Sequence, residues 1–321
     1  MDKLRDKYGR KIDYLRISIT DRCNLRCRYC MPAEGVDLKE HSEILSFEDI
    51  VKIVHVGKKI GIEKVRITGG EPLVRLGIEN LISRLADLDI KDISMTTNGV
   101  LLADKAEQLK KAGLDRVNIS LDTLQKEKFE EITRRDDFAN VIKGIDKALD
   151  IGLDPVKLNV VVMKGLNDDE LLDFVELSRE KKLHIRFIEY MPLGGEADEE
   201  NFLSSDQIKE IIEAEYELVP AVTKGNGPAK YLKVPGAEGT IGFISALSEH
   251  FCADCNRFRL TADGRFKPCL ASDREVEIAE SMSEEDIYEA YEKALQIKPA
   301  AHHLNFADND KHQRSMSQIG G

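Results

Sequence analysis

The chain has 321 residues, of which 42% are hydrophobic and 33% charged, and its formal net charge is −12. A chain of this length can form one large α/β domain with a smaller appendix. The acidic balance argues against nucleic acid or a membrane surface as a partner, because both require a basic face. No apolar run approaches the roughly 20 residues that span a bilayer, and residues 1–15 contain no apolar signal core. We therefore expect a cytoplasmic protein, in which cysteine clusters bind metals more often than they form disulfides.

Strands and helices are predicted to alternate over residues 10–215. Strands are expected at 13–20, 92–97 and 184–190, and amphipathic helices at 46–60, 103–112 and 138–151. Three similar segments begin at Gly61, Gly113 and Gly152, where a glycine suits the left-handed end of a helix and an alternating strand follows. This order predicts parallel βαβ units and an α/β fold, most simply an incomplete (β/α)6 barrel of the TIM type.

Two helix starts carry the spacing of a capping box, Ser46 with Asp49 and Asn167 with Glu170. In this motif the first side chain accepts a hydrogen bond from a backbone N–H of the first turn, and the acidic side chain accepts one from the backbone N–H of the first residue. We expect helices to begin directly after Ser46 and Asn167.

The alternation within the strands predicts what fills the barrel. In the first strand Arg16, Ser18 and Thr20 share one face, and aliphatic residues occupy the other. The matching positions of later strands are also polar: Arg66, Thr68, Asn118, Ser120, Lys157 and Asn159. Because the aliphatic face must meet the helices, the polar face should line the lumen. Closed barrels usually pack aliphatic residues there, so the pattern favours a cavity for a large polar ligand. An interior network of paired charges is the alternative.

The composition changes over residues 216–240, which are rich in glycine and proline and have no helical period. We place a domain boundary there and expect a barrel domain over 1–220 and a smaller C-terminal domain over 221–321. Short antiparallel strands are predicted within 241–270, and a helix near 283–295.

Three cysteines, Cys23, Cys27 and Cys30, form a C-x3-C-x2-C pattern after the first strand. This is the C-terminal end of the barrel, where such folds place their active sites. Three thiolates can bind three irons of a 4Fe–4S cluster and leave the fourth iron without a protein ligand. Zinc sites prefer paired C-x2-C units and four closed ligands, so the spacing is a poor zinc pattern.

The spacing resembles the signature of the radical S-adenosylmethionine (SAM) superfamily. The resemblance implies that the open iron binds SAM and that electron transfer cleaves it to a 5′-deoxyadenosyl radical. It also implies that Tyr29 packs on the adenine. Residues 69–72, Gly-Gly-Glu-Pro, follow a predicted strand at the same end of the barrel and resemble the superfamily motif that binds the methionine amino group. Alone, they would indicate only a turn.

A second triad, Cys252, Cys255 and Cys269, has C-x2-C-x13-C spacing. By spacing alone zinc remains an alternative, with His250 as a fourth ligand. Arg257 and Arg259 occupy alternate positions after the pair, so on a strand they point the same way. Paired guanidinium groups suit a phosphate or a purine edge, whereas a solvated strand face is the other interpretation.

The segment C-N-R-x-R-L-T-A-D-G, the closing C-L and the final Gly320-Gly321 resemble one branch of the superfamily, which converts GTP in the first step of molybdenum-cofactor synthesis. The resemblance implies a second 4Fe–4S cluster whose open iron binds the guanine. The radical would remove the ribose 3′ hydrogen and yield 3′,8-cyclo-7,8-dihydro-GTP. It also implies that the C-terminal Gly-Gly reaches into the active site.

The resemblance assigns roles to individual residues. It assigns the first cluster to Cys23, Cys27 and Cys30 and the second to Cys252, Cys255 and Cys269. It assigns SAM to Tyr29, Gly70, Ser120 and Met191, and GTP to Arg16, Arg66, Thr97, Lys157, Arg257 and Arg259. The first triad, Arg257 and Arg259 are the expected catalytic residues.

Expected partners follow from the same resemblance. They are a flavodoxin- or ferredoxin-type reductant and a downstream cyclic pyranopterin monophosphate synthase, while a homodimer is left open. Another radical SAM enzyme with an auxiliary cluster, acting on peptides, is the nearest alternative, although such enzymes usually carry more C-terminal cysteines. A non-catalytic iron–sulfur carrier or zinc module is the second alternative, and it would leave Gly-Gly-Glu-Pro and the polar lumen unexplained.

Overall fold

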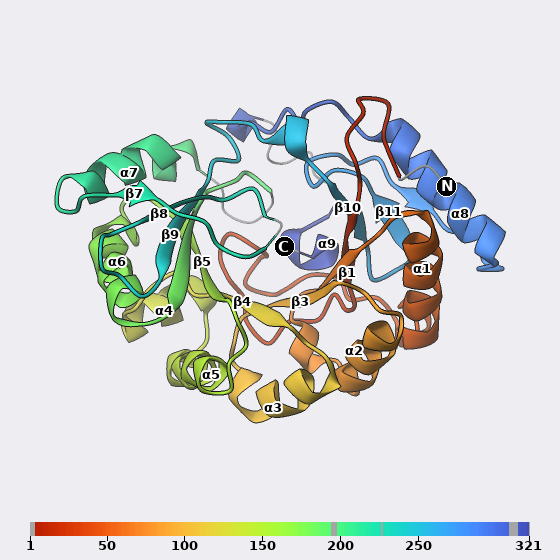
Figure 1. Ribbon diagram of the computed structural model, residues 1–321, viewed down its shortest axis with the longest axis horizontal. Helices are drawn as coiled ribbons and strands as arrows, with labels where there is room; N and C mark the ends of the chain where they lie inside the picture. Colours follow the sequence, from red (N-terminus) through yellow and green to blue (C-terminus); the bar gives the residue numbers. More distant parts are fainter. Residues whose placement is uncertain (1–3, 194–197, 226, 308–313, 321) are drawn as a thin grey trace.

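The computed structural model describes residues 4–193, 198–225, 227–307 and 314–320. Within them, six neighbouring parallel strands form the centre of one curved sheet. These strands are β1 (Tyr14–Ser18), β2 (Lys64–Thr68), β3 (Asp92–Thr97), β4 (Arg116–Ser120), β5 (Val156–Val162) and β6 (Leu183–Glu189). Figure 1 shows the strands curving around a central space with the helices outside them. The expected incomplete α/β barrel is confirmed.

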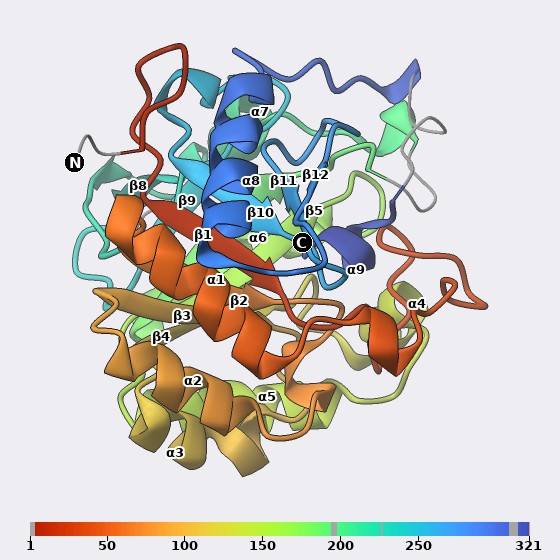
Figure 2. The ribbon, with the colours of Figure 1, turned by 90° about the vertical axis from the view of Figure 1, so that its right-hand side faces the viewer.

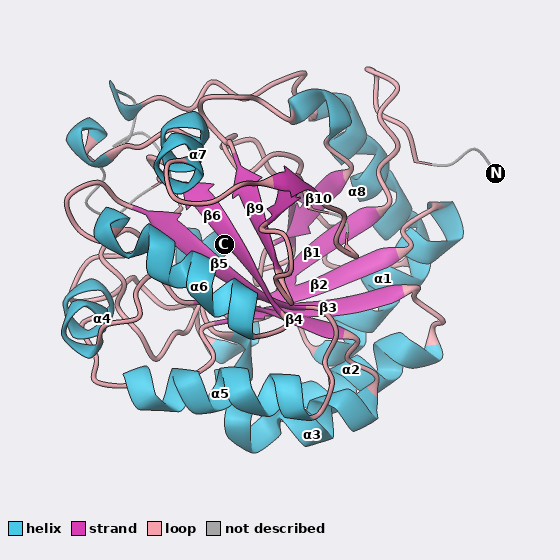
Figure 3. Cartoon of the chain, turned by 60° about the vertical axis from the view of Figure 1, so that its left-hand side comes forward, coloured by secondary structure: helices cyan, strands magenta, loops and turns pink. Residues whose placement is uncertain are grey.

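The helices follow the strands in the predicted order. They are α1 (Phe47–Ile60), α2 (Ile78–Asp87), α3 (Leu102–Ala112), α4 (Lys126–Thr133), α5 (Phe138–Asp150), α6 (Leu171–Glu180) and α7 (Ser205–Glu213). Short 3₁₀ turns lie at η1 (His41–Glu43), η2 (Pro72–Val74), η3 (Asp168–Glu170), η4 (Glu199–Asn201) and η5 (Cys252–Asp254). Figure 3 shows the strands as a curved fan with α2, α3 and α5 along one side. None of the described helices has the length and apolar character needed to cross a membrane.

One of the two predicted capping boxes is present and the other is wrong. At the start of α1 the Ser46 hydroxyl accepts a hydrogen bond from the backbone N–H of Asp49, and the Asp49 carboxylate accepts one from the backbone N–H of Ser46. Asn167 caps nothing, because its side chain accepts from the N–H of Met163 and donates to the carbonyls of Asp122 and Val161. Its amide therefore ties two barrel loops together.

The C-terminal strands extend both open edges of the barrel sheet. They are β7 (Val219–Pro220), β8 (Lys230–Lys233), β9 (Thr240–Ile244), β10 (Arg257–Leu260), β11 (Arg265–Lys267) and β12 (Val276–Glu277). β9 runs parallel to β6, and β10 runs parallel to β1. Within the predicted range, 241–270, the antiparallel pair is β10–β11. The pairs β7–β8, β8–β9 and β11–β12, which involve strands outside that range, are antiparallel as well. Pairing with the barrel satisfies the edge hydrogen bonds of β1 and β6. The predicted boundary at 220/221 thus lies within a continuous sheet and stays a prediction.

Two C-terminal helices complete the fold, α8 (Glu284–Ile297) and α9 (Met316–Ile319). Helix α8 begins after Ser283, which forms a capping box with Asp286, close to the predicted start. It lies against α1 (Figure 2), where Tyr291 fills the space left by Gly57. Helix α9 lies inside the barrel, near the centre of Figure 1.

Candidate active site

The barrel encloses a cavity of about 250 Å³, many times the roughly 10–15 Å³ that one water needs. Most of the predicted site residues line it: Arg16, Cys23, Cys27, Tyr29, Cys30, Arg66, Gly70, Thr97, Ser120, Met191, Arg257 and Arg259. The structure thus brings together residues from five strands and three loops. Lys157 and the second cysteine triad do not belong to this lining.

The first cysteine triad lies in the loop after β1. Backbone N–H groups of Cys30 and Met31 both donate to the Cys27 carbonyl, which forms a tight turn between the second and third cysteines. Burial raises the pKa of Cys23 to about 11 and that of Cys30 to about 12. Metal binding at these thiols must therefore displace protons. Three cysteines on one cavity wall suit a cluster that keeps one iron open to a ligand.

The Gly69-Gly70 pair packs against this loop. The N–H of Gly70 donates to the carbonyl of Thr20 at 2.8 Å, and a Cβ at either glycine would overlap backbone atoms of residues 20–22. The glycines are therefore required for the close approach of two loops. Glu71, which is buried, accepts from the Thr97 hydroxyl and the Asn98 N–H at 2.8 and 2.7 Å.

Tyr29 faces the same cavity, and its position is fixed from β4 and β5. Its hydroxyl donates to Asp122 at 2.7 Å, and Asp122 also accepts from the N–H of Val161 at 2.8 Å. Burial raises the pKa of Asp122 to about 6. Ser120, at the end of β4, and Met191, two residues after β6, line the wall nearby.

A ring of positive charge surrounds the other part of the cavity. Arg16 of β1 lies in register with Arg66 of β2 and with Arg259 of β10. Burial and the neighbouring Arg257 lower the pKa of Arg259 to about 10, and burial also lowers that of Arg66 to about 10. Both stay protonated near neutral pH, so an acidic protein holds a strongly positive interior, which suits a polyanion.

Arg186 of β6 was not among the predicted residues, yet it lines the cavity and donates to Asn159. Three polar atoms of the cavity-lining residues are buried without a hydrogen-bond partner among the described residues: Tyr14 Oη, Thr96 Oγ1 and Arg186 Nε. Unsatisfied buried groups are costly and rare. They indicate that the cavity accommodates a polar ligand rather than a sealed network of paired charges.

Lys157 and Thr97 are already bonded to protein groups. The Lys157 ammonium donates to the Lys224 carbonyl at 2.6 Å and lies 5.2 Å from the centre of the Tyr231 ring. Burial lowers its pKa to about 6, and Arg186 adds to the shift. Thr97 lines the cavity, but its hydroxyl donates to Glu71 and accepts from the N–H of Gly99.

The second cysteine triad lies beside the cavity, whose lining includes Phe251, Arg257 and Leu270. Cys252 begins η5 and Cys255 follows it, while Cys269 follows β11. Burial is opposed at Cys255 by Arg257 and Lys298, which lower its pKa to about 7. His250 and His302 stack at 4.2 Å, and their ring nitrogens lie within 4.8 Å of the Cys252 sulfur.

The C-terminal segment enters the cavity, and Met316 and Ser317 line it. The Ser317 N–H donates to the Cys30 sulfur. Arg259 donates to the Gly320 carbonyl, as does Arg16 at 3.4 Å. Gly320 has a φ of +72°, and a Cβ there would meet Thr68. The expected entry of the tail is thus seen for Gly320, and Gly321 lies outside the described residues.

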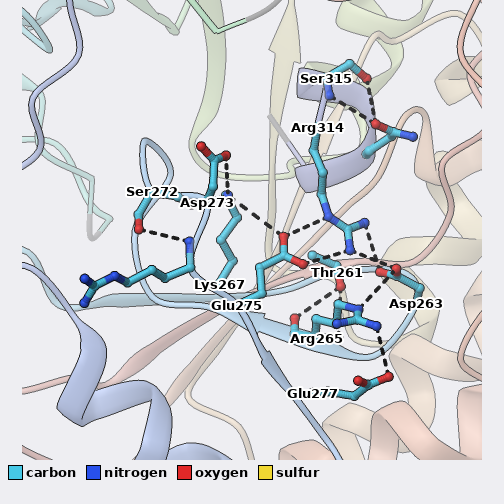
Figure 4. Close-up of polar contacts among 12 residues, drawn as sticks. Thr261, Asp263, Arg265, Lys267, Ser272, Asp273, Glu275, Glu277, Arg314 and Ser315 are labelled. Atoms are coloured by element: carbon cyan, nitrogen blue, oxygen red, sulfur yellow. Dashed lines mark hydrogen bonds and ion pairs between the residues drawn. The ribbon is translucent and has the colours of Figure 1, made fainter. Parts of the chain in front are cut away.

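Arg314 anchors this segment to the C-terminal strands (Figure 4). It donates two hydrogen bonds to Asp263 at 3.1 and 2.9 Å and contacts Glu275 at 2.8 and 2.9 Å. Glu275 also lies 3.9 Å from Lys267. Bidentate guanidinium–carboxylate pairs fix geometry as well as charge, so the network fixes where the tail starts.

Two family models match the chain. The Radical SAM superfamily covers residues 17–178, and Molybdenum Cofactor Synthesis C covers residues 183–304. The GTP 3′,8-cyclase of Petrotoga mobilis is 56% identical over 98% of this chain and 99% of its own length. That of Thermodesulfovibrio yellowstonii is 52% identical over 99% of this chain and 100% of its own. The chain belongs to the GTP 3′,8-cyclase family. This radical SAM family carries two 4Fe–4S clusters, which the two cysteine triads fit, and zinc at the second triad is not supported.

Solved structures confirm the fold. SuiB of Streptococcus suis, bound to its precursor peptide SuiA, matches with a TM-score of 0.62 and 18% identity over 82% of this chain. This chain spans 61% of SuiB. The structure of anSMEcpe with bound AdoMet matches with a TM-score of 0.56 and 15% identity, over 93% of this chain and 91% of its own. The fold alone would not distinguish a GTP 3′,8-cyclase from a peptide-modifying enzyme. The sequence identity to the cyclases over nearly the whole chain does distinguish them.

Arg186 and Asp122 were not predicted as site residues, although the alternation of polar and aliphatic residues in the sequence indicated them. Arg186 lies on a predicted strand, and Asp122 lies two residues after Ser120, so alternation would have placed both on the lumen side. The partners of Lys298 and Arg314 gave no such signal, because they lie 30 to 51 residues away along the chain.

Proposed function

We propose that this chain is a GTP 3′,8-cyclase of molybdenum-cofactor synthesis. The first cluster and SAM supply a 5′-deoxyadenosyl radical, which takes the ribose 3′ hydrogen of GTP and leads to 3′,8-cyclo-7,8-dihydro-GTP. The observation that best supports this function is the ring of buried and half-buried arginines in the same cavity as the first cysteine triad. GTP brings roughly four negative charges, which an acidic protein can hold only in a focused basic site.

Cys23, Cys27 and Cys30 would hold the first cluster, and Cys252, Cys255 and Cys269 the second. Tyr29, Gly70, Ser120 and Met191 would bind SAM. The Tyr29–Asp122 hydrogen bond supports this assignment, because it holds the aromatic ring at the cavity wall. Gly70 contributes mainly by letting its loop pack on the cysteine loop.

Arg16, Arg66, Arg257 and Arg259 would hold GTP, and Thr97 and Lys157 complete the proposed set. The arginines would fix the ribose relative to the radical and exclude water, which is how orientation lowers a barrier. Lys157 would first have to leave the Lys224 carbonyl. The guanine would lie toward the second triad, beside which Arg257 and Phe251 line the cavity.

The proposal also covers the domains, the partner proteins and the cellular location. Residues 1–220 would form the radical SAM domain and 221–321 the domain of the second cluster. A flavodoxin- or ferredoxin-type protein would supply electrons, and a cyclic pyranopterin monophosphate synthase would use the product. We place the protein in the cytoplasm, where thiols are kept reduced, and leave a homodimer as one alternative.

Anaerobic reconstitution with metal analysis and a product assay tests the proposed function. We expect about eight irons per chain and no zinc, because two cubane clusters hold four irons each. Reduced enzyme should convert GTP only when SAM is present. Cys255→Ser should keep SAM binding at the first cluster and lose GTP turnover. About four irons with one zinc, or normal cyclisation by Cys255→Ser, would contradict it.

A further inference from the structure

Lys298 is a buried cation beside the second cysteine triad. It follows the last residue of α8, and only 1% of its surface is exposed. Lysine is almost never buried to this degree without partners. Its ammonium group donates to the Pro268 carbonyl at 2.6 Å, the Arg257 carbonyl at 2.9 Å and the Cys255 sulfur at 3.4 Å. An ammonium group has three donor protons, so the three acceptors satisfy it.

The three acceptors come from three separate parts of the second-cluster segment. Cys255 follows η5, Arg257 begins β10, and Pro268 directly precedes Cys269. One side chain from the far end of α8 therefore holds both ends of the long C-x13-C loop. It also fixes the start of the strand that carries the two cavity arginines.

The charge of Lys298 needs an anion nearby. No carboxylate in the described part of the chain lies within ion-pair distance of it. Burying a lone cation is costly, and carbonyl groups satisfy its hydrogen bonds without neutralising its charge. The sulfur of Cys255 is the remaining partner, and it becomes negative as a thiolate ligand.

The first triad lacks this arrangement. Its sulfurs receive hydrogen bonds from the Leu25 N–H, the Asn98 amide and the Ser317 N–H, which are all neutral donors. Cys255 instead receives hydrogen bonds from the charged side chains of Lys298 and Arg257, so the two triads differ in the charge of their hydrogen-bond donors. Hydrogen bonds to sulfur and local charge set the reduction potential of iron–sulfur clusters.

We propose that Lys298 is a positioning residue for the second cluster: it donates to the Cys255 thiolate, raises the reduction potential of that cluster and fixes the adjoining start of β10. This inference rests on the proposed function, since it takes the second triad to hold a 4Fe–4S cluster.

The test compares Lys298→Met with the wild-type protein and two other variants. Methionine has a similar length but neither charge nor donor, whereas Lys298→Arg keeps both. Lys293→Met is the matched control, because Lys293 lies on α8 five residues before Lys298, its side chain is 61% exposed, and it pairs with Glu289. Each reconstituted protein is analysed for iron and titrated with reductant under an electron paramagnetic resonance (EPR) readout. The signal that GTP perturbs identifies the second cluster.

We expect Lys298→Met to shift the reduction of that cluster to a more negative potential, Lys298→Arg to restore it toward the wild-type value, and Lys293→Met to leave it unchanged. An unchanged potential in a Lys298→Met protein with full iron would overturn the inference. If Lys298→Met loses iron, Lys298→Gln decides, since it keeps N–H donors without the charge. A more negative potential in Lys298→Gln supports the inference, and a wild-type potential overturns it. Zinc at the second triad of the wild-type protein would instead refute the proposed function.

Discussion

Arg259 combines burial, a place on the cavity wall and a positive charge near neutral pH. A charge-assisted hydrogen bond to a buried anion is worth about 1.5–3 kcal/mol. We therefore expect Arg259→Ala to lower kcat/KM for GTP roughly ten- to a hundredfold. Steady-state kinetics and direct GTP binding on the same samples measure the effect.

The matched control is Arg265→Ala. Arg265 lies on the neighbouring strand β11 and pairs with the exposed Glu277 at 3.0 Å, outside the cavity lining. Both variants should keep the iron content of the wild-type protein. Unchanged GTP kinetics in Arg259→Ala with intact clusters would remove Arg259 from the proposed GTP site.

Gly70 gives a second expectation for a single residue. A methyl group there would overlap the backbone of Arg22, so Gly70→Ala should displace the loop that carries Cys23. We expect a loss of up to about four irons, one cubane, together with loss of SAM cleavage. Gly165→Ala is the control for loop strain without overlap, because Gly165 has a φ of +76° but open space around it, so it should leave the irons and SAM cleavage unchanged. Full iron and normal cleavage in Gly70→Ala would show that the loops can separate freely.

Motif spacing predicted the cavity residues where local alternation was enough, as for Arg16, Arg66 and Ser120. It failed where the geometry depends on distant segments. Nothing in residues 154–160 indicates that the Lys157 ammonium is covered by the Lys224 carbonyl. The Gly-Gly-Glu-Pro motif also gives no sign that its glycines, which line the cavity, pack against the cysteine loop about 50 residues earlier in the chain.

The chain directly before helix α9 is held to the C-terminal strands by Arg314. The pairs of Arg314 with Asp263 and Glu275 are partly exposed, and such a pair contributes about 1 kcal/mol. We expect Arg314→Ala to lower GTP turnover about fivefold while leaving both clusters in place. The effect should shrink at high salt, where the wild-type pairs are themselves screened. Turnover at several salt concentrations, with iron analysis, measures it.

Asp263→Asn is the companion variant, since it weakens the same pair from the strand side. Its effect should not add fully to that of Arg314→Ala, because both remove one interaction. Additive losses in the double variant, or unchanged turnover in Arg314→Ala, would mean that the tail is held by its cavity contacts alone.

At the scale of elements, hydrophobic residues that recur every 3.6 or every two positions were sufficient to predict α1, α3, α5 and the barrel strands. The observed bounds differ from the predicted ones by up to two residues. The same periods could not predict which strands the C-terminal strands pair with. A period of two identifies β9 and β10 as strands but does not say that each pairs in parallel with a barrel edge. The wrong capping box at Asn167 has the same cause, because residue spacing shows which hydrogen bonds could form but not which ones do form.

For the whole molecule, the pairing of β10 with β1 explains how two triads more than 220 residues apart flank one cavity. The first triad follows the C-terminal end of β1, whereas Cys252 and Cys255 precede the N-terminal end of β10. Because these neighbouring strands are parallel, the two triads lie at opposite ends of the strands that line the cavity. The surface keeps the net negative charge while the arginines lie inside. Composition predicted the need for a local basic pocket, but only the continuous sheet shows how the C-terminal arginines reach it.

The transfer of the ribose 3′ hydrogen tests the proposed function most directly. Reconstituted enzyme is given SAM, a reductant and GTP carrying deuterium at the ribose 3′ carbon, with GTP deuterated at the 2′ carbon as the control. We predict deuterium in the 5′-deoxyadenosine from the 3′-labelled substrate alone, together with a cyclised product. Unlabelled 5′-deoxyadenosine beside unchanged GTP would contradict the proposed function.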